Sequence, residues 1–379
     1  MFNLNPSHWE RHRGLGSYDV VIIGTGMVGL WTAYLYLLRK PGKKVLLLDK
    51  LPSGQAGAST RNAGFACFGS PTELLDDLRH EKEEDVIQRL RWRYEGLISW
   101  RGHFEADQLD WCPENGHEVF TNGEKDSYHS VLASLEHLNA LAKAANIPGK
   151  VYQIGKAVGP QLPHSIQICH EAGLHPGKGH QALTSRVLEL GGHLHRGILV
   201  PQKSEWTRID QTWKIPTSQG IVYTSQVVIA ANAWSSELLP HLDVIPGRGQ
   251  ILLTSAISEL PFQGTYHADA GYIYFRNVGK RLLLGGGRNV FRQAEESHKA
   301  MTTAEVQIYL EAYARDVLLP NIPFEVEERW AGIMAFSSDG SKMPYVHSEG
   351  EDCFVAARMG GMGVALSPVV GQQMAVMLH

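Results

Sequence analysis

A glycine-rich turn between an apolar strand and a helical segment constrains this chain most. Residues 19–23 form a β-branched apolar run of the kind found in buried parallel strands, and they lead directly into Gly24-x-Gly26-x-x-Gly29. In a dinucleotide site the first glycine permits the turn, the second admits a pyrophosphate, and the third lets the helix pack on the strand. The backbone amides that begin the helix then face the phosphates.

A carboxylate follows at the position where such a site needs one. Residues 45–48 are expected to form the second strand, and Asp49 stands at its carboxyl end. A carboxylate there accepts hydrogen bonds from an adenosine ribose and would repel the 2′-phosphate of NADP. The turn alone does not distinguish FAD from NAD, so an NAD-only dehydrogenase is an alternative at this point.

Composition bounds the remaining possibilities. With 379 residues and 43% hydrophobic content the chain can form two domains, and its net charge of -4 predicts no face for nucleic acid. The absence of an apolar leader and of a long apolar run favours a cytoplasmic protein without a signal peptide or transmembrane segment. The cysteines are far apart, as expected of reduced thiols: Cys67, Cys112, Cys169 and Cys353.

Histidines are frequent in one region, but we expect no metal site. His193-x-His195 on a strand would point two imidazoles in the same direction. No acidic or cysteine partner follows at ligand spacing, and the other histidines fall on different elements.

A second motif makes the resemblance to a family specific. The segment GASTRNAG at residues 57–64, behind the glycine turn, resembles the D-amino-acid oxidase and glycine oxidase superfamily of FAD enzymes. Similar segments follow in the family's order: 171–192, the strand leading to Val200, VVIAANAWS at 227–235, IPGRGQIL at 245–252, and AARMGGMGV at 356–364. The chain departs from the family at Asn232, where a glycine is usual.

The resemblance implies an α/β fold with two domains. A Rossmann-like FAD-binding domain would comprise residues 18–76, 165–244 and 328–379, so its chain would be discontinuous. A substrate domain with an antiparallel sheet and helices would comprise residues 77–164 and 245–327, after an N-terminal extension at 1–17.

The resemblance also implies the residues that bind non-covalent FAD. No cysteine occurs at 330–339, where sarcosine-oxidase relatives attach the flavin. The implied FAD-binding residues are Gly24, Thr25, Gly26, Met27, Val28, Gly29, Asp49, Lys50, Ala58, Ser59, Thr60, Asn62, Ala63, Gly64, Val200, Ala231, Asn232, Trp234, Gly360, Gly361, Met362, Gly363 and Val364.

For the substrate, the resemblance implies oxidation of a C–N bond of a small amine or amino acid. Family enzymes hold the carboxylate with an arginine and a tyrosine, and the tyrosine position falls near Tyr266. The arginine position falls on Met334, which is a departure from the family. Arg358 stands before the flavin-contacting turn and could hold an anionic substrate or support the flavin or a domain contact.

Three questions stay open from the sequence. Leu283 aligns loosely with an oxygen-activating lysine, so the electron acceptor is undecided, as is the oligomeric state. The loss of the arginine at Met334 keeps oxidation of a 2-hydroxy acid or another C–O bond as an alternative. A flavoprotein module acting in a larger assembly, such as tRNA modification, is an alternative of another class.

The intervening segments predict scaffold elements. Apolar periodicity predicts one long helix over residues 73–104 and another over 127–145. A hairpin is expected around the turn at 277–280. Thr302 with Glu305 predicts a capping box at the start of a helix that continues through Leu319.

Overall fold

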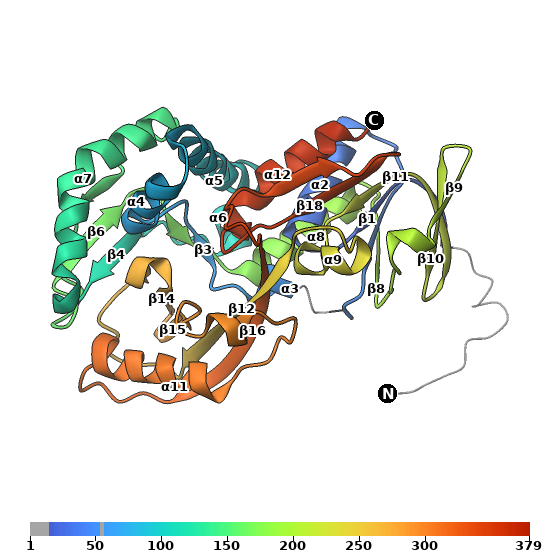
Figure 1. The fold of residues 1–379 in the computed structure, drawn as a ribbon. Helices are drawn as coiled ribbons and strands as arrows, with labels where there is room; N and C mark the ends of the chain where they lie inside the picture. The colour runs from blue at the N-terminus through green and yellow to red at the C-terminus, as the bar shows by residue number, and fades with distance from the viewer. Residues whose placement is uncertain (1–14, 54–56) are drawn as a thin grey trace.

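The computed structural model describes residues 15–53 and 57–379, which form two large sheets flanked by helices (Figure 1). Most of the expected N-terminal extension lies outside the described residues. Each large sheet has eight strands, and a two-stranded sheet joins β3 (Phe65–Ala66) to β7 (Ala172–Gly173). The α/β class expected from the sequence is confirmed.

The first sheet is organised around the strand that precedes the glycine turn. β1 pairs in parallel with β2 and β11, β2 with β8, and β11 with β18, whereas the edge strand β17 is antiparallel. Strands β9 and β10 extend it beyond β11. The bounds are β1 Gly16–Ile23, β2 Val45–Asp49, β8 His193–Arg196, β9 Thr207–Ile209, β10 Thr212–Thr217, β11 Gly220–Ile229, β17 Tyr345–Ser348 and β18 Cys353–Ala357.

Helices cover one face of this sheet. Alternate residues of β1 and β2 pack with them in one core, while the other alternate residues pack toward the β9–β10 hairpin. In Figure 1 the last helix, in red, lies beside the first, in blue. A Cβ on Gly371 would be 2.5 Å from that of Trp31, so these two helices touch closely. The covering helices are α2 Met27–Arg39, α5 Glu83–His103, α8 Pro176–Glu189 and α12 Gly363–Met377.

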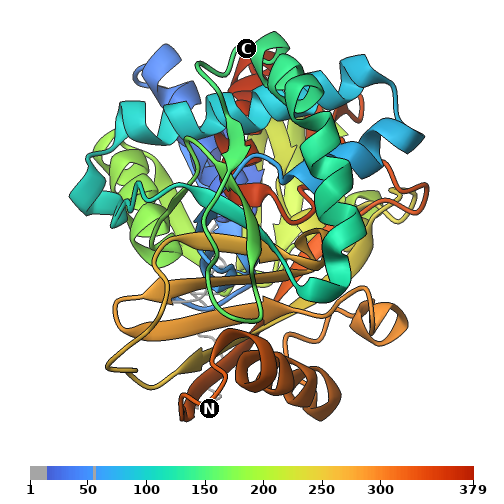
Figure 2. The same cartoon turned by 90° about the vertical axis from the view of Figure 1, so that its left-hand side faces the viewer.

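The second sheet has the order β16-β12-β15-β14-β13-β4-β6-β5 and is antiparallel except between β13 and β4. In Figure 2 the orange strands of this sheet run across the lower half of the molecule, with α11 (Ala304–Tyr313) beneath them. The expected hairpin at 277–280 is confirmed. The strands are β4 Gly116–Phe120, β5 Tyr152–Ile154, β6 His164–Ile168, β12 Ile245–Thr254, β13 Thr265–Ala268, β14 Ile273–Val278, β15 Arg281–Gly286 and β16 Val326–Phe336.

The two faces of the second sheet have different partners. One face packs against α11 through a core that includes Leu252 and Phe275. The opposite face carries Ile251 and Leu283, which pack against Phe65. This second face is therefore turned toward the part of the molecule built on the first sheet, the first domain.

The long helix expected over 73–104 is wrong, because two helices occupy that segment. α4 (Pro71–His80) ends before Glu81, and α5 begins after Lys82, whose ψ of 142° is extended. The Arg89 guanidinium donates to both Asp77 and Glu81 across the break. This buried pairing stabilises a bend that the periodicity of the sequence does not show.

The other helices are close to expectation. α7 (Lys125–Ala144) corresponds to the helix predicted over 127–145. The N-cap of α11 is Thr303 rather than Thr302, and a π-helical turn at Ala314–Leu318 follows it. The short helices are α3 Gly57–Arg61, α6 Ala106–Leu109, α9 Ser235–Leu238 and α10 Arg292–Glu295.

The domain boundaries stay a prediction. β6 and β16 both pair within the second sheet, yet most of their residues fall in segments assigned to the FAD-binding domain. β16 is also tied to α3, because the Trp330 indole donates to the Arg61 carbonyl at 3.0 Å. Strands of the second sheet thus reach into the interface between the domains.

Candidate active site

The glycine turn forms the floor of the site at the carboxyl end of β1. Gly24 has φ of 116°, and a Cβ there would collide with the Ala230 carbonyl. A Cβ on Gly29 would collide with the Gly24 carbonyl, so the helix packs on the turn as predicted. Gly26 is the N-cap of α2 and has no side chain with which to cap it, and the first turn of the helix has no acidic residue. Such a helix start can accept an anion.

Asp49 stabilises this turn from the next strand. Its carboxylate accepts hydrogen bonds from the Thr25 amide at 2.8 Å and the Thr25 hydroxyl at 2.6 Å. On the other side, the ring of His180 contacts the Thr25 carbonyl at 2.8 Å, and burial lowers the pKa of His180. His180 was missed from the sequence, because a histidine within a helix carries no signal of a contact with a distant turn. The ribose contact of Asp49 stays a prediction.

The small-residue loop folds against the start of α2. The Ser59 hydroxyl accepts a hydrogen bond from the Met27 amide at 2.9 Å. Asn62 closes the turn after α3 by donating to the carbonyls of Ala58 and Ser59 and accepting from the Gly64 amide. The predicted residues of this segment therefore lie beside the glycine turn.

Gly64 permits a close contact between the loop and the second sheet. It has φ of 74°, and a Cβ there would collide with the Leu174 carbonyl. The Arg276 guanidinium, from β14, donates to the carbonyls of Gly64 at 2.6 Å and Leu174 at 2.9 Å. Arg276 was also missed from the sequence, since an arginine in a strand ordinarily indicates an exposed face.

The turn after β11 takes the backbone shape that the family's glycine would take. Asn232 has φ of 48°, a left-handed conformation that asparagine tolerates better than most residues. Its side-chain oxygen accepts a weak hydrogen bond from the Met359 amide at 3.4 Å. Lys50 lies over the Trp234 ring at 4.7 Å and pairs with Glu237 at 2.8 Å.

The turn after β18 is the last of the predicted FAD-binding segments. Gly360 has φ of 54° and donates to the Ala335 carbonyl of β16 at 3.0 Å. Gly363 then begins α12, which has no acidic residue in its first turn. The indole of Trp100 donates to the Val364 carbonyl at 2.9 Å, joining α5 to this helix start.

All these turns lie at one edge of the first sheet. β1, β2, β11 and β18 run parallel, so the turns after them meet at their common carboxyl edge. In open α/β sheets this edge is where dinucleotides bind. The residues fit FAD, because Gly24, Gly26 and Gly29 place no side chain at the glycine turn, and the first turns of α2 and α12 carry no acidic residue that would repel a phosphate.

Met334 lies between this edge and the second sheet. Its sulfur is 4.0 Å from the Cβ position of Gly361, and its methyl is 3.0 Å from that of Gly249. The Tyr274 hydroxyl is 3.5 Å from the same Gly249 position. Burial raises the pKa of Tyr274 to about 12, so this phenol stays protonated. The Met334 side chain therefore lies between the Gly361 turn and Tyr274, at the position where the resemblance implies the carboxylate-binding arginine.

Tyr266 lies on the other face of the second sheet and is not brought to Met334. Its ring stacks on Phe275 and His117, and its hydroxyl donates to the Gln263 carbonyl at 2.6 Å. It belongs to the core that packs under α11. Because neighbouring residues of a strand point to opposite faces, His267 faces the first domain, where its ring lies 5.1 Å from that of Phe65. Tyr274, and not Tyr266, is the tyrosine beside Met334.

Arg358 has partners within the protein. Its guanidinium pairs with Asp243 at 3.5 Å and lies 5.2 Å from the centre of the Tyr345 ring. Its φ of 62° is unusual for a residue with a side chain. This placement favours the alternative in which Arg358 supports a contact between segments.

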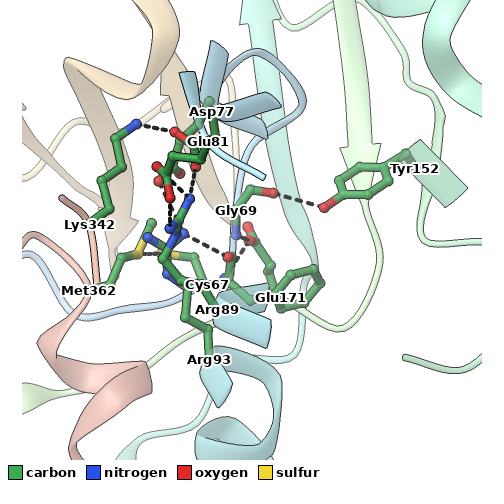
Figure 3. A network of polar contacts seen from close by, with 12 residues as sticks. Cys67, Gly69, Asp77, Glu81, Arg89, Arg93, Tyr152, Glu171, Lys342 and Met362 are labelled. Atoms are coloured by element: carbon green, nitrogen blue, oxygen red, sulfur yellow. Dashed lines mark hydrogen bonds and ion pairs between the residues drawn. The ribbon is translucent and has the colours of Figure 1, made fainter. Parts of the chain in front are cut away.

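A buried polar network supports the wall of the site behind Cys67 (Figure 3). The Arg93 guanidinium donates to the Phe68 carbonyl and to Glu73, each at 3.0 Å. Glu171 accepts from the Phe68 and Gly69 amides. On the outer side, Lys342 pairs with Asp77, which also pairs with Arg89.

Two carboxyl groups in this wall resist ionisation. Burial raises the pKa of Glu171 to about 8 and that of Glu118 to about 7. Glu118 accepts hydrogen bonds from the amide and hydroxyl of Thr72, at the start of α4. The Cys67 thiol contacts the Met362 sulfur at 3.6 Å, and burial raises its pKa well above the ordinary value. Cys67 is thus a packed thiol that joins this wall to the turn before α12.

Comparison with known proteins agrees with this geometry. A family model described as FAD dependent oxidoreductase matches residues 19–377. The chain belongs to this family. It is therefore an FAD-dependent oxidoreductase. The family, the FAD cofactor and the fold class expected from the sequence are confirmed.

Individual family members are distant relatives of this chain. A glycine oxidase from Bacillus licheniformis is 23% identical over 373 residues, covering 95% of this chain and 93% of the relative. The crystal structure of glycine oxidase from Geobacillus kaustophilus matches with a TM-score of 0.74 and 20% identity, covering 96% of this chain and 94% of that one. L-Proline dehydrogenase from P. horikoshii matches with a TM-score of 0.71 and 17% identity, covering 95% and 92%. At these identities the structural matches show the fold.

The face of the second sheet that carries Tyr274 is apolar. Ile251, Leu253 and Leu283 pack with Ala63 on the face that carries Tyr274. In the part of the chain described, no helix is both long and apolar enough to cross a bilayer.

Proposed function

We propose that this oxidoreductase oxidises the C–N bond of a small amine or amino acid. Bound FAD supplies a two-electron acceptor for such a reaction. The chain's own residues hold the cofactor by backbone, orient the substrate over the Gly360–Gly361 turn, and exclude water with Met334, Tyr274 and Leu283. The relatives that support this assignment include glycine oxidases and a dimethylglycine dehydrogenase.

One observation favours amines over alcohols. Oxidation of a hydroxyl requires a base for its proton, whereas a neutral amine can release a hydride without one. His267 faces the first domain, but burial lowers its pKa to about 4, so it is a weak base. Tyr274 remains protonated, with a pKa of about 12. Oxidation of a C–O bond remains the second candidate, because Met334 stands where the family's carboxylate-binding arginine would be.

The test is anaerobic mixing of the FAD-bound protein with amines, N-methyl amino acids, D- and L-amino acids, and matched 2-hydroxy acids. Loss of the flavin absorbance near its visible maximum reports reduction. We expect at least one amine to reduce the flavin while its hydroxy analogue does not. Reduction by hydroxy acids alone would overturn the assignment.

The position of Leu283 favours an electron acceptor other than oxygen. Its side chain is buried on the face toward the first domain, and the resemblance loosely aligns this position with the oxygen-activating lysine of sarcosine-oxidase relatives. We expect the reduced protein to pass electrons to a quinone or dye faster than to oxygen. Stopped-flow reoxidation compares the two acceptors, and faster reoxidation by air would contradict this expectation.

A further inference from the structure

Arg288 is a cation without an anionic partner. It follows β15, and its guanidinium lies 3.7 Å from the centre of the Phe336 ring. Its Nε atom is buried and makes no hydrogen bond. Among residues 15–53 and 57–379, no side chain or carbonyl forms a hydrogen bond or ion pair with this guanidinium. A half-buried guanidinium whose Nε is buried without a hydrogen-bond partner carries a free-energy cost, so its position requires a reason.

The carboxylates near Arg288 are already engaged. Glu295 is held by Arg248 at 2.6 Å and by Gln250 at 3.0 Å, on the α11 side of β12. Glu296 lies 3.7 Å from Arg292, one turn away. Burial lowers the pKa of Arg288, whereas the more distant charges of these two glutamates only partly offset that shift. The anion that Arg288 lacks is therefore absent from the described residues.

Arg288 lies on the face of the second sheet that carries Phe336, next to the strand pair formed by Gly247 and Met334. The Cβ position of Gly247 is 3.0 Å from the Arg288 Nε, and Gly247 is the register partner of Met334. The absence of a side chain at Gly247 makes room for the Phe336 ring, with which a Cβ there would collide, and for the guanidinium stacked on it. The Phe336 ring under the guanidinium is in turn 3.9 Å from the Cβ position of Gly360.

The environment of Arg288 differs from that of the other arginines near the site. Arg276 is committed to two carbonyls, and Arg358 is paired with Asp243. Stacking on Phe336 keeps the guanidinium plane fixed while leaving its N–H groups available. A fixed guanidinium fork binds a carboxylate through two parallel hydrogen bonds.

We propose that Arg288 binds the acid group of the substrate, reaching it from the end of β15 while Met334 fills the position on β16. The substrate class is then an amine that carries a carboxylate, bound with its acid group over Phe336. This inference rests on the proposed function, because it locates the substrate at the Gly360–Gly361 turn. Tyr272, exposed at the start of β14, lies within electrostatic reach of the same guanidinium.

The test uses the FAD-bound protein, with benzoate as the carboxylate probe and benzamide as its neutral counterpart. Perturbation of the flavin absorbance reports binding of each probe. We expect Arg288→Met to weaken benzoate binding at least tenfold and to leave benzamide binding unchanged. Arg288→Lys should retain part of the affinity, because it keeps the charge but loses the fork. Arg292→Met, four residues away and exposed, is the matched control and should bind benzoate as the unmodified protein does.

Several outcomes would overturn the proposal. Equal benzoate affinity in Arg288→Met and the unmodified protein would exclude Arg288 as the anion-binding residue, as would failure of the unmodified protein to bind benzoate. Loss of FAD from Arg288→Met, with unchanged probe binding after FAD is added back, would assign Arg288 to the cofactor.

The failure of the inference is distinguishable from the failure of the proposed function. If amines without an acid group reduce the flavin as well as amino acids do, and Arg288→Met has no effect on KM, the function holds and the inference fails. If benzoate binding depends on Arg288 but no amine reduces the flavin, the anion site holds and the proposed C–N oxidation fails.

Discussion

Substituting Gly26 by alanine separates binding of the cofactor from stability of the fold. Gly26 has φ of -70° and ψ of 176°, which alanine adopts without strain. The new Cβ would lie 2.9 Å from the Ser59 hydroxyl, so the side chain of Ser59 must shift by a few tenths of an ångström. The same methyl group would occupy the space through which a pyrophosphate approaches the backbone.

The expected magnitude follows from the cost of overpacking. Inserting a methyl group into a close-packed site costs about 1–3 kcal/mol, and 1.4 kcal/mol is about tenfold in affinity. We therefore expect Gly26→Ala to bind FAD roughly 5- to 150-fold more weakly, with an unchanged circular dichroism spectrum. Titration of the apoprotein with FAD, followed by quenching of flavin fluorescence, measures the dissociation constant.

Gly102→Ala is the matched control for this measurement. Gly102 lies in the last turn of α5, and a Cβ there would meet nothing within 4 Å. Its FAD affinity should equal that of the unmodified protein. Unchanged FAD affinity in Gly26→Ala would refute the role of this glycine in admitting the pyrophosphate.

Two further predictions concern the walls of the site. Gly96→Ala would place its Cβ against the Ala365 carbonyl of α12, so it should lower the free energy of unfolding by about 1–3 kcal/mol. Gly102→Ala in the same helix should not lower it. Equal midpoints of the two variants in thermal unfolding would refute this packing. Glu171 has its pKa raised to about 8, so its contribution to stability is present below the ordinary carboxyl pKa and is lost as pH rises toward 8. Glu171→Gln should therefore reduce the fall in unfolding midpoint between pH 5 and 8, and an unchanged pH dependence would contradict the account.

The sequence could predict the cofactor side of the site because its signals are local. The turn after β1 needs Gly24 for its φ of 116°, and the backbone contacts of Gly26 and Gly29 follow from the strand–turn–helix unit itself. Asn232 was identified as a departure from the family, and the structure gives it the left-handed φ of 48°. At this edge of the first sheet, the residues that the backbone turns require are also the residues that leave room for the cofactor.

The substrate side could not be predicted in the same way, because tertiary packing determines it. Both faces of the second sheet are apolar, so alternation along β13 does not reveal that Tyr266 faces α11 and His267 the first domain. The break before α5 depends on the pairing of Arg89 with distant carboxylates. Arg288 follows three glycines at the end of a strand, where no periodicity indicates the direction of its side chain.

A single turnover without oxygen tests C–N oxidation directly through its products. The FAD-bound protein is mixed with an acyclic amine that reduces its flavin, and the products are quantified after quenching. C–N oxidation predicts one equivalent of a carbonyl product and one of ammonia or released amine for each FAD reduced. Reduction of the flavin with nitrogen retained in the product, or with a hydroxy acid as the only competent substrate, would contradict the account.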